Sequence, residues 1–304
     1  MNDPLSSAAK VRPDAPALDD GGRVWTYAEL DAAAGRMARR LAPLGAAPGA
    51  TVALVAHPNA LAVQAVWAVP RTGAVLAPLN PRLGRAAMER ALHVIGPDLI
   101  LGTEQDLHDS AVDADWVTTL DDLPRPPGER MPGGPFAPDG ATGPDGGGSG
   151  LGDQRADEGD HVDPVAAIRA DGSRPLALLW TSGTSGDPDA IPVLASALDA
   201  SARASVERLG LTETDRWYAS LSLGHVGGLA LVHRAAHVGC TLVVRGRFST
   251  EVLVELIDHE GLTHASLVPT MLRRLLDMRG DRTVPSTLRG LLIGGAAAGG
   301  ALVP

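Results

Sequence analysis

Two residue types that often carry chemistry are almost absent from this chain of 304 residues. Cys240 is the only cysteine, which excludes a disulfide framework and a cysteine-rich metal site. Lys10 is the only lysine, so arginine supplies nearly all of the positive charge. Because no cysteine framework requires an oxidising compartment, a cytoplasmic location is the default expectation.

Long apolar runs and an excess of positive charge are missing as well. No apolar run approaches the ~20 residues that a membrane-spanning helix requires. The start, Met1-Asn2-Asp3-Pro4, lacks the basic-then-apolar pattern of a secretory signal. A net charge of −10 argues against a nucleic-acid-binding surface. The length suits one or two domains with a large buried core.

Glycine and hydroxyl residues gather in one stretch, Thr181-Ser182-Gly183-Thr184-Ser185-Gly186. The apolar run Leu176–Trp180 before it has the length of a buried strand, and we expect a helix after it. Glycines let successive backbone N–H groups turn toward one point, and the hydroxyls add donors, which suits a phosphate group. An isolated cluster of this kind is more often a surface turn. The expected strand before it and helix after it favour a phosphate loop.

The same stretch resembles the phosphate loop of the adenylate-forming (AMP-binding) superfamily of acyl-CoA synthetases, luciferases and peptide-synthetase adenylation domains. That loop reads roughly Ser/Thr-Ser-Gly-Thr-Thr-Gly-x-Pro-Lys-Gly, and this chain follows it through Pro188. Asp189 and Ala190 then stand where the family has Lys and Gly. A lysine attracts polyphosphate, whereas Asp187 and Asp189 repel it unless a cation lies between them. The resemblance implies that residues 181–186 bind the ATP phosphates, although less favourably than the family loop.

The first 123 residues alternate between segments typical of strands and of helices. After an irregular lead-in at 12–24, Thr26 and Glu29 have capping-box spacing and start a helix that stops at Gly45. Strands are expected at 52–56, 75–78 and 99–101, and helices at 60–71 and 85–95. This rhythm predicts βαβ units and a parallel sheet covered by helices on both faces.

Residues 124–164 differ in composition from the rest of the chain. Their 11 glycines and 8 prolines leave too little apolar surface to offset the entropy of ordering the chain. We therefore expect a disordered insertion between a first α/β subdomain at 1–123 and a second at 165–304.

The second subdomain is expected to resume the alternation. Strands are predicted at 217–221, 241–244, 264–267 and 288–293, and helices at 196–209, 228–237, 249–259 and 270–278. Both segments resemble the N-terminal domain of the adenylate-forming enzymes. The resemblance implies an α/β fold of two parallel-sheet subdomains with helices on both faces, and a C-terminal portion outside this sequence.

Residues at the expected strand ends could line a substrate pocket. His225 could donate a hydrogen bond to a substrate carboxylate, and Gly227 and Gly228 permit close backbone approach. A lone histidine is more often a surface or structural residue. The family, however, has a similar His-x-Gly-Gly segment that lines the acyl pocket, which makes His225 the single catalytic candidate. The resemblance further implies an acyl and adenine pocket at Pro269, Thr270, Gly294, Gly295 and Ala296.

A metal site is not expected from the sequence. His233 and His237 lie four residues apart on a predicted helix and could both reach one metal ion. No third ligand follows at a motif spacing, so an ordinary helix face is the favoured interpretation.

The family reaction implies ATP, Mg²⁺ and CoA as cofactors or substrates, and a small carboxylic acid as the partner molecule. The acid is activated to an acyl-adenylate and then transferred to CoA. In the family, a Thr-Glu motif for Mg²⁺, a ribose-binding Asp, a hinge and a catalytic Lys follow the position of Pro304. We therefore expect an incomplete catalyst, working as a homodimer or with a separately encoded C-terminal part. Two alternatives stay open: an inactive nucleotide- or acyl-binding module, and a ligase for another aryl or fatty acid.

Overall fold

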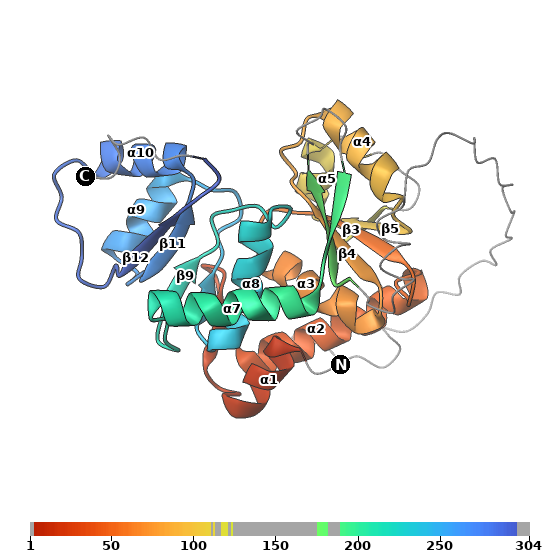
Figure 1. Ribbon diagram of the computed structural model, residues 1–304, viewed down its shortest axis with the longest axis horizontal. Coiled ribbons are helices and arrows are strands. Elements are labelled where there is room, and N and C mark those ends of the chain that lie inside the picture. The colour runs from red at the N-terminus through yellow and green to blue at the C-terminus, as the bar shows by residue number, and fades with distance from the viewer. Residues whose placement is uncertain are drawn as a thin grey trace, which may run out of the picture.

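The computed structural model describes residues 3–110, 112, 117–120, 123, 175–181 and 189–296. The described strands form two six-stranded sheets with helices on both faces (Figure 1). The insertion expected at 124–164 lies outside the described residues. No helix in the described ranges is long and apolar enough to cross a bilayer.

The first sheet has the strand order β6-β5-β3-β4-β7-β8. Its strands are β3 (Thr51–Val55), β4 (Val75–Leu79), β5 (Leu99–Gly102), β6 (Val117–Thr119), β7 (Ala177–Thr181) and β8 (Asp189–Val193). Neighbouring strands are parallel except for β7 and β8, which form an antiparallel hairpin.

The second sheet has the strand order β12-β11-β9-β10-β1-β2. Its strands are β1 (Pro16–Asp19), β2 (Val24–Thr26), β9 (Arg216–Tyr218), β10 (Thr241–Val243), β11 (His264–Leu267) and β12 (Gly290–Ile293). Only the edge pair β1–β2 is antiparallel among these described strands.

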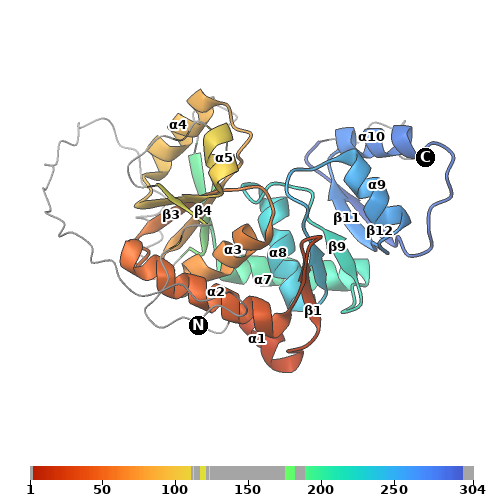
Figure 2. The same ribbon diagram turned by 180° about the vertical axis from the view of Figure 1, so that it is seen from behind.

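Helices occupy three layers around the two sheets (Figures 1 and 2). One core cluster joins both sheets to the helices α2 (Tyr27–Leu41), α3 (Ala60–Thr72), α7 (Ala195–Leu209) and α8 (Val226–Val238). The outer face of the first sheet packs on α4 (Arg85–Ile95) and α5 (Glu104–Asp109). The outer face of the second packs on α9 (Thr250–Asp258) and α10 (Pro269–Arg279). Alternate side chains of β3 enter the two cores, since Val52 and Leu54 face the central helices while Ala53 and Val55 face α4.

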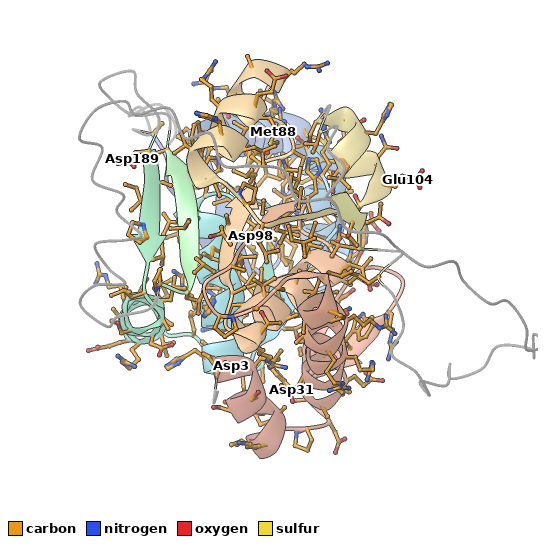
Figure 3. All side chains as sticks on the ribbon, turned by 90° about the vertical axis from the view of Figure 1, so that its right-hand side faces the viewer. Asp3, Asp31, Met88, Asp98, Glu104 and Asp189 are labelled. Atoms are coloured by element: carbon orange, nitrogen blue, oxygen red, sulfur yellow. The ribbon has the colours of Figure 1, made fainter. Side chains whose placement is uncertain are left out.

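Hydrogen bonds from one arginine connect the start of the N-terminal helix α1 (Pro4–Val11) to the central helices. Arg71 of α3 donates hydrogen bonds to Asp3 at 2.8 and 3.1 Å and to Asp31 of α2 at 2.6 Å. Figure 3 shows Asp3 and Asp31 close together at the lower end of the molecule. A short 3₁₀ helix (Ala42–Leu44) follows α2 and ends at Gly45, whose φ is 102°.

The fold class expected from the sequence is confirmed, as are most predicted elements. Thr26 and Glu29 form the capping box that starts α2, and α4 and β11 have the predicted bounds. The prediction of an irregular lead-in at 12–24 was wrong, because β1 and β2 form a hairpin there. The turn is closed by Asp19, which accepts a hydrogen bond from Gly21 (2.9 Å; φ 86°).

Strands from the two sequence segments mix in both sheets. The hairpin β1–β2 from the first segment completes the second sheet, and β7–β8 from the second segment completes the first. The division of the chain into subdomains at 1–123 and 165–304, with an insertion at 124–164, therefore stays a prediction. The elements α1, α5, β6 and β8 were not predicted.

Candidate functional site

A cavity of about 180 Å³ lies where the carboxyl ends of strands from both sheets meet. The first sheet contributes His57, Pro58, Asn80 and Arg82, which follow β3 and β4. The second sheet contributes Ser220, Leu221, Ser222, His225, Gly246, Arg247, Phe248, Val268 and Met271, which follow β9, β10 and β11. In α/β proteins ligands bind outside the carboxyl ends of parallel strands, so this cavity is the best-placed candidate site.

Glycines allow the two sheets to meet at this edge. A Cβ on Gly224 would lie 2.8 Å from the backbone nitrogen of Asn80, so the loop after β9 rests directly on the end of β4. A Cβ on Gly228 would lie 2.1 Å from the carbonyl oxygen of Ser222, which holds the start of α8 against the same loop. Gly228 is therefore required by packing, whether or not a ligand also approaches it.

His225 lies at the cavity as the sequence predicted. It is the N-cap of α8 and has an extended backbone, and its carbonyl accepts hydrogen bonds from Gly228 and Leu229 at 3.0 and 3.1 Å. Its imidazole is exposed and has no hydrogen-bond partner within the described part of the chain. The ring is therefore available to a ligand, and its catalytic role stays a prediction.

The glycine-hydroxyl loop connects two antiparallel strands. Thr181 ends β7 and pairs with Asp189 at the start of β8, and both residues are exposed. Leu76 of β4 pairs with Ala177 of β7, so Thr181 lies at the level of Asn80 on the edge that bears the cavity. The helix expected after the loop is present as α7, and the unpredicted strand β8 (residues 189–193) lies between the loop and that helix. Ser182, Gly183, Thr184, Ser185 and Gly186 lie outside the described residues, and their phosphate-binding role stays a prediction.

The remaining predicted pocket residues surround Val268. Pro269 and Thr270 form the first turn of α10, between the cavity-lining residues Val268 and Met271. Gly294, Gly295 and Ala296 are exposed beyond the edge strand β12. A Cβ on Gly295 would lie 3.2 Å from Val268 Cγ1. None of these five residues lines the cavity itself, and their acyl- and adenine-binding roles stay predictions.

His57, which lines the cavity, is paired with an aspartate, Asp106, and sequence reasoning missed this pair. Asp106 of α5 accepts hydrogen bonds from the backbone nitrogen of His57 at 3.0 Å and from its Nδ1 at 2.5 Å. Burial raises the pKa of Asp106, but the hydrogen bonds from His57 outweigh it and hold this pKa below its ordinary value. Asp106 is therefore a carboxylate that orients the imidazole. The position of His57 directly after a buried strand was the one signal that could have drawn attention to it.

The cavity has a positive electrostatic character. Arg82 and Arg247 line it, and neither side chain has a hydrogen bond or an ion pair among the residues that the structure describes. No aspartate or glutamate belongs to its described lining. The described residues also contain no group of three or more His, Cys, Asp or Glu that could hold a metal ion. The cavity therefore favours an anionic ligand, and we assign no Mg²⁺ site to these residues.

A model of the AMP-binding enzyme family matches residues 5–303. The chain belongs to this family. Among curated relatives, the 2-succinylbenzoate–CoA ligase of Bacillus licheniformis is 29% identical over 97% of this chain and 54% of its own length. The ligase of the same name from Listeria monocytogenes is 26% identical over 98% of this chain and 56% of its own length. This family member thus spans about half the length of these relatives.

Solved structures of other proteins also match this chain. The o-succinylbenzoate coenzyme A synthetase MenE of Bacillus subtilis in complex with AMP superimposes with a TM-score of 0.73 at 26% identity, covering 96% of this chain and 67% of that one. Its complex with ATP and magnesium gives a TM-score of 0.75 at 26% identity, covering 99% and 56%. The N-terminal domain of FACL13 from Mycobacterium tuberculosis, at 22% identity and a TM-score of 0.75 over 99% of this chain and 71% of that one, shares the fold.

Proposed function

We propose that this chain forms the acid- and nucleotide-binding part of an AMP-forming 2-succinylbenzoate–CoA ligase of menaquinone biosynthesis. The observation that carries the proposal is the positively charged cavity at the joined carboxyl edges of two sheets, in a family member whose relatives include ligases of that name. The sequence supports the same substrate. Four segments, 214–217, 225–228, 263–272 and 294–298, resemble the corresponding sequences of that group of ligases.

The chemistry of this reaction fits the cavity's charge. In the first step a carboxylate oxygen bonds to the α-phosphorus of ATP and pyrophosphate leaves; in the second, the CoA sulfur bonds to the acyl carbon and AMP leaves. Both steps move negative charge, so cations and hydrogen-bond donors must surround the reacting groups. In this proposal residues 181–186 hold the phosphates. His225 contacts the acid, and Pro269, Thr270 and residues 294–296 flank the acyl and adenine groups.

Binding measurements test the substrate assignment directly. We expect 2-succinylbenzoate to raise the melting temperature of the chain more than hexanoate or octanoate at equal concentration, because only the former carries two carboxylates for a cationic cavity. An equal or larger shift with the fatty acids would favour a ligase for another acid. Asp189→Lys is expected to tighten ATP binding, since it replaces repulsion of the polyphosphate by attraction.

A non-catalytic binding module is the second candidate, and it is favoured by Asp187 and Asp189 beside the phosphate loop. The purified chain is expected to show no ATP–pyrophosphate exchange under either proposal. Exchange above an enzyme-free blank would contradict the proposal that residues outside this chain complete the reaction. Restored exchange on addition of a C-terminal ligase fragment would favour the ligase, whereas ATP binding without exchange in that mixture would favour the module.

We further propose a cytoplasmic protein that works as a homodimer or with a separately encoded C-terminal part. Sedimentation of the purified chain checks the first arrangement, since a dimer has twice the mass of the 31.2 kDa chain. Co-purification from the source cells checks the second.

A further inference from the structure

His57 presents a buried ring nitrogen that the described structure leaves without a partner. Its Nδ1 is held 2.5 Å from Asp106, so this nitrogen carries the hydrogen of the neutral ring and Nε2 carries the lone pair. Nε2 is fully buried and has no hydrogen-bond partner among the described residues. Because Nδ1 is held by Asp106, Nε2 is the ring nitrogen that is left without a partner among the described residues.

A buried polar atom without a partner costs about 1–3 kcal/mol, so such an atom in a residue that lines a cavity suggests that a bound group satisfies it. His57 lines the cavity between the sheets, and His225 lines it as well. The cavity is large enough for a carboxylate or phosphate group, which would replace several waters of about 30 Å³ each.

The charges around His57 come from four elements. Asp106 of α5 contacts one side of the ring, and Arg82 after β4, His225 before α8 and Arg247 after β10 share its cavity. The Asp106 carboxylate lies 2.5 Å from Nδ1, so a positive charge on the ring would have an opposite charge directly beside it. An anion bound in the cavity would place a second negative charge near Arg82 and Arg247.

We propose that this cavity is an oxyanion-binding subsite in which His57 takes up a proton as the anion binds. The proton comes from solvent and adds to Nε2, which then donates a hydrogen bond to the bound carboxylate or phosphate oxygen, while Nδ1 continues to donate to Asp106. The subsite deepens the ligase function proposed above, because both the acid and CoA carry such oxyanions. The carboxylate of the acid and the phosphates of CoA would both fit such a subsite, and the experiment below distinguishes them.

Calorimetric titration of the purified chain tests the subsite. The probes are 2-succinylbenzoate, CoA and inorganic pyrophosphate, each titrated in two buffers of different ionisation enthalpy, which reports the protons taken up. We expect at least one probe to bind with uptake of up to one proton and with an affinity that rises from pH 8 to pH 6. The probe that does so identifies the source of the oxyanion.

Two variants locate the proton. His57→Gln is expected to weaken binding of that probe about tenfold, the size of one hydrogen bond to a charged group, and to abolish the proton uptake. Asp106→Asn keeps one oxygen that can accept the Nδ1 hydrogen, loses the acceptor for the His57 backbone N–H and lacks the negative charge, so it should reduce the uptake. His259→Gln on the exposed end of α9 is the matched control and should leave both unchanged. Should His57→Gln fail to fold, Asp106→Asn and Arg247→Gln carry the same test.

The outcomes separate this inference from the ligase proposal. Binding of 2-succinylbenzoate or CoA with proton uptake unchanged in His57→Gln would overturn the subsite and leave the ligase standing. Uptake that depends on His57 for pyrophosphate alone would support the subsite and count against the acid and CoA as its occupants. Failure of all three probes to bind would overturn the subsite.

Discussion

Two aspartate–histidine pairs lie at opposite edges of the parallel strands, and they differ in how completely they are satisfied. His264 begins β11 and Asp215 directly precedes β9, so this pair lies at the amino edge. Asp215 is fully buried and accepts hydrogen bonds from Arg289 at 2.6 Å and from the backbone of Thr212 at 2.7 Å. At the carboxyl edge, Asp106 orients His57, whose Nε2 has no partner among the described residues.

The contrast follows from what each edge must do. At the amino edge His264 stacks on Trp217 with a ring separation of 5.0 Å, and its Nδ1 forms a 2.8 Å hydrogen bond with Thr263. The same Nδ1 lies 3.6 Å from an Asp215 oxygen, and we expect this buried network to contribute to stability. In the carboxyl-edge pair, the histidine lines the cavity and one of its ring nitrogens has no partner among the described residues, at an edge where ligands bind in such folds. The same two residue types therefore support a stability role at one edge and a binding role at the other.

Replacing the amino-edge carboxylate should have the largest effect. Asp215→Ala leaves the guanidinium of Arg289 and the backbone of Thr212 without their acceptor, so we expect a loss of about 3–4 kcal/mol in the free energy of unfolding. Asp106→Ala should cost about 1–2 kcal/mol, because it removes hydrogen bonds to a single residue. Urea denaturation measures both.

Glu89→Ala is the matched control, because Glu89 pairs with Arg85 on the surface of α4, with both side chains more than half exposed. It should change the free energy of unfolding by less than about 0.5 kcal/mol. Equal losses for Asp215→Ala and Asp106→Ala would remove the distinction between the two edges.

His233 is a third case to compare with the two pairs, because it is a buried histidine with no carboxylate as a hydrogen-bond partner among the described residues. Neither ring nitrogen has a partner in the described structure, the ring lies 4.5 Å from that of Trp67, and burial lowers its pKa to about 4. The unfolded chain has a pKa of about 6.5 here, so the native state binds fewer protons. The stability contribution is therefore complete above pH 6.5 and is lost as the pH falls toward 4, by about 3 kcal/mol.

Unfolding free energies measured in urea from pH 7.5 to 4 check this prediction. His233→Phe keeps an aromatic ring against Trp67 and cannot be protonated, so its stability should fall less over that range. An unchanged pH dependence in His233→Phe would contradict the assignment. His264, whose pKa is also lowered, chiefly by burial, contributes in the same direction in both proteins.

Whether a contact of the fold or of the candidate site could be predicted depends on how far apart its residues lie in the sequence. Thr26 and Glu29 are three apart, and their capping box was recognised from local spacing. His57 and Asp106 are 49 apart in the sequence, with α3, β4, α4 and β5 between them, so no local pattern reveals their contact. His225 was found because its segment follows the strand predicted at 217–221, precedes a predicted helix and resembles the family's His-x-Gly-Gly segment.

The strand order was hidden for the same reason. The sequence of residues 12–24 shows no strand pattern, but in the structure β1 pairs in parallel with β10. Residues 189–193 likewise form a strand by pairing with β7. Long-range pairing overrides the weak local preference of short segments.

Gly224 tests whether the carboxyl edge depends on close backbone approach. Gly224→Ala would place a Cβ 2.8 Å from the Asn80 nitrogen and 3.1 Å from the Pro78 oxygen, and backbone atoms cannot move aside cheaply. We expect a loss of about 2 kcal/mol in the free energy of unfolding and weaker binding of whichever anion occupies the cavity. Gly22→Ala is the control, since its Cβ would meet only an Asp20 oxygen at 3.7 Å.

Gly35 supplies the opposite case and the smallest effect. It lies inside α2, away from both edges, and a Cβ there would meet the Nη1 atoms of Arg39 and Arg71 at 3.8 and 3.9 Å, which are ordinary contact distances. Because alanine loses less backbone entropy than glycine in a helix, Gly35→Ala should raise the free energy of unfolding by about 0.5–1 kcal/mol. Anion binding at the cavity should not change. A gain in stability at Gly35 beside a loss at Gly224 would show that glycine is required by geometry at the carboxyl edge, whereas a loss at both positions would mean that α2 tolerates no added side chain either.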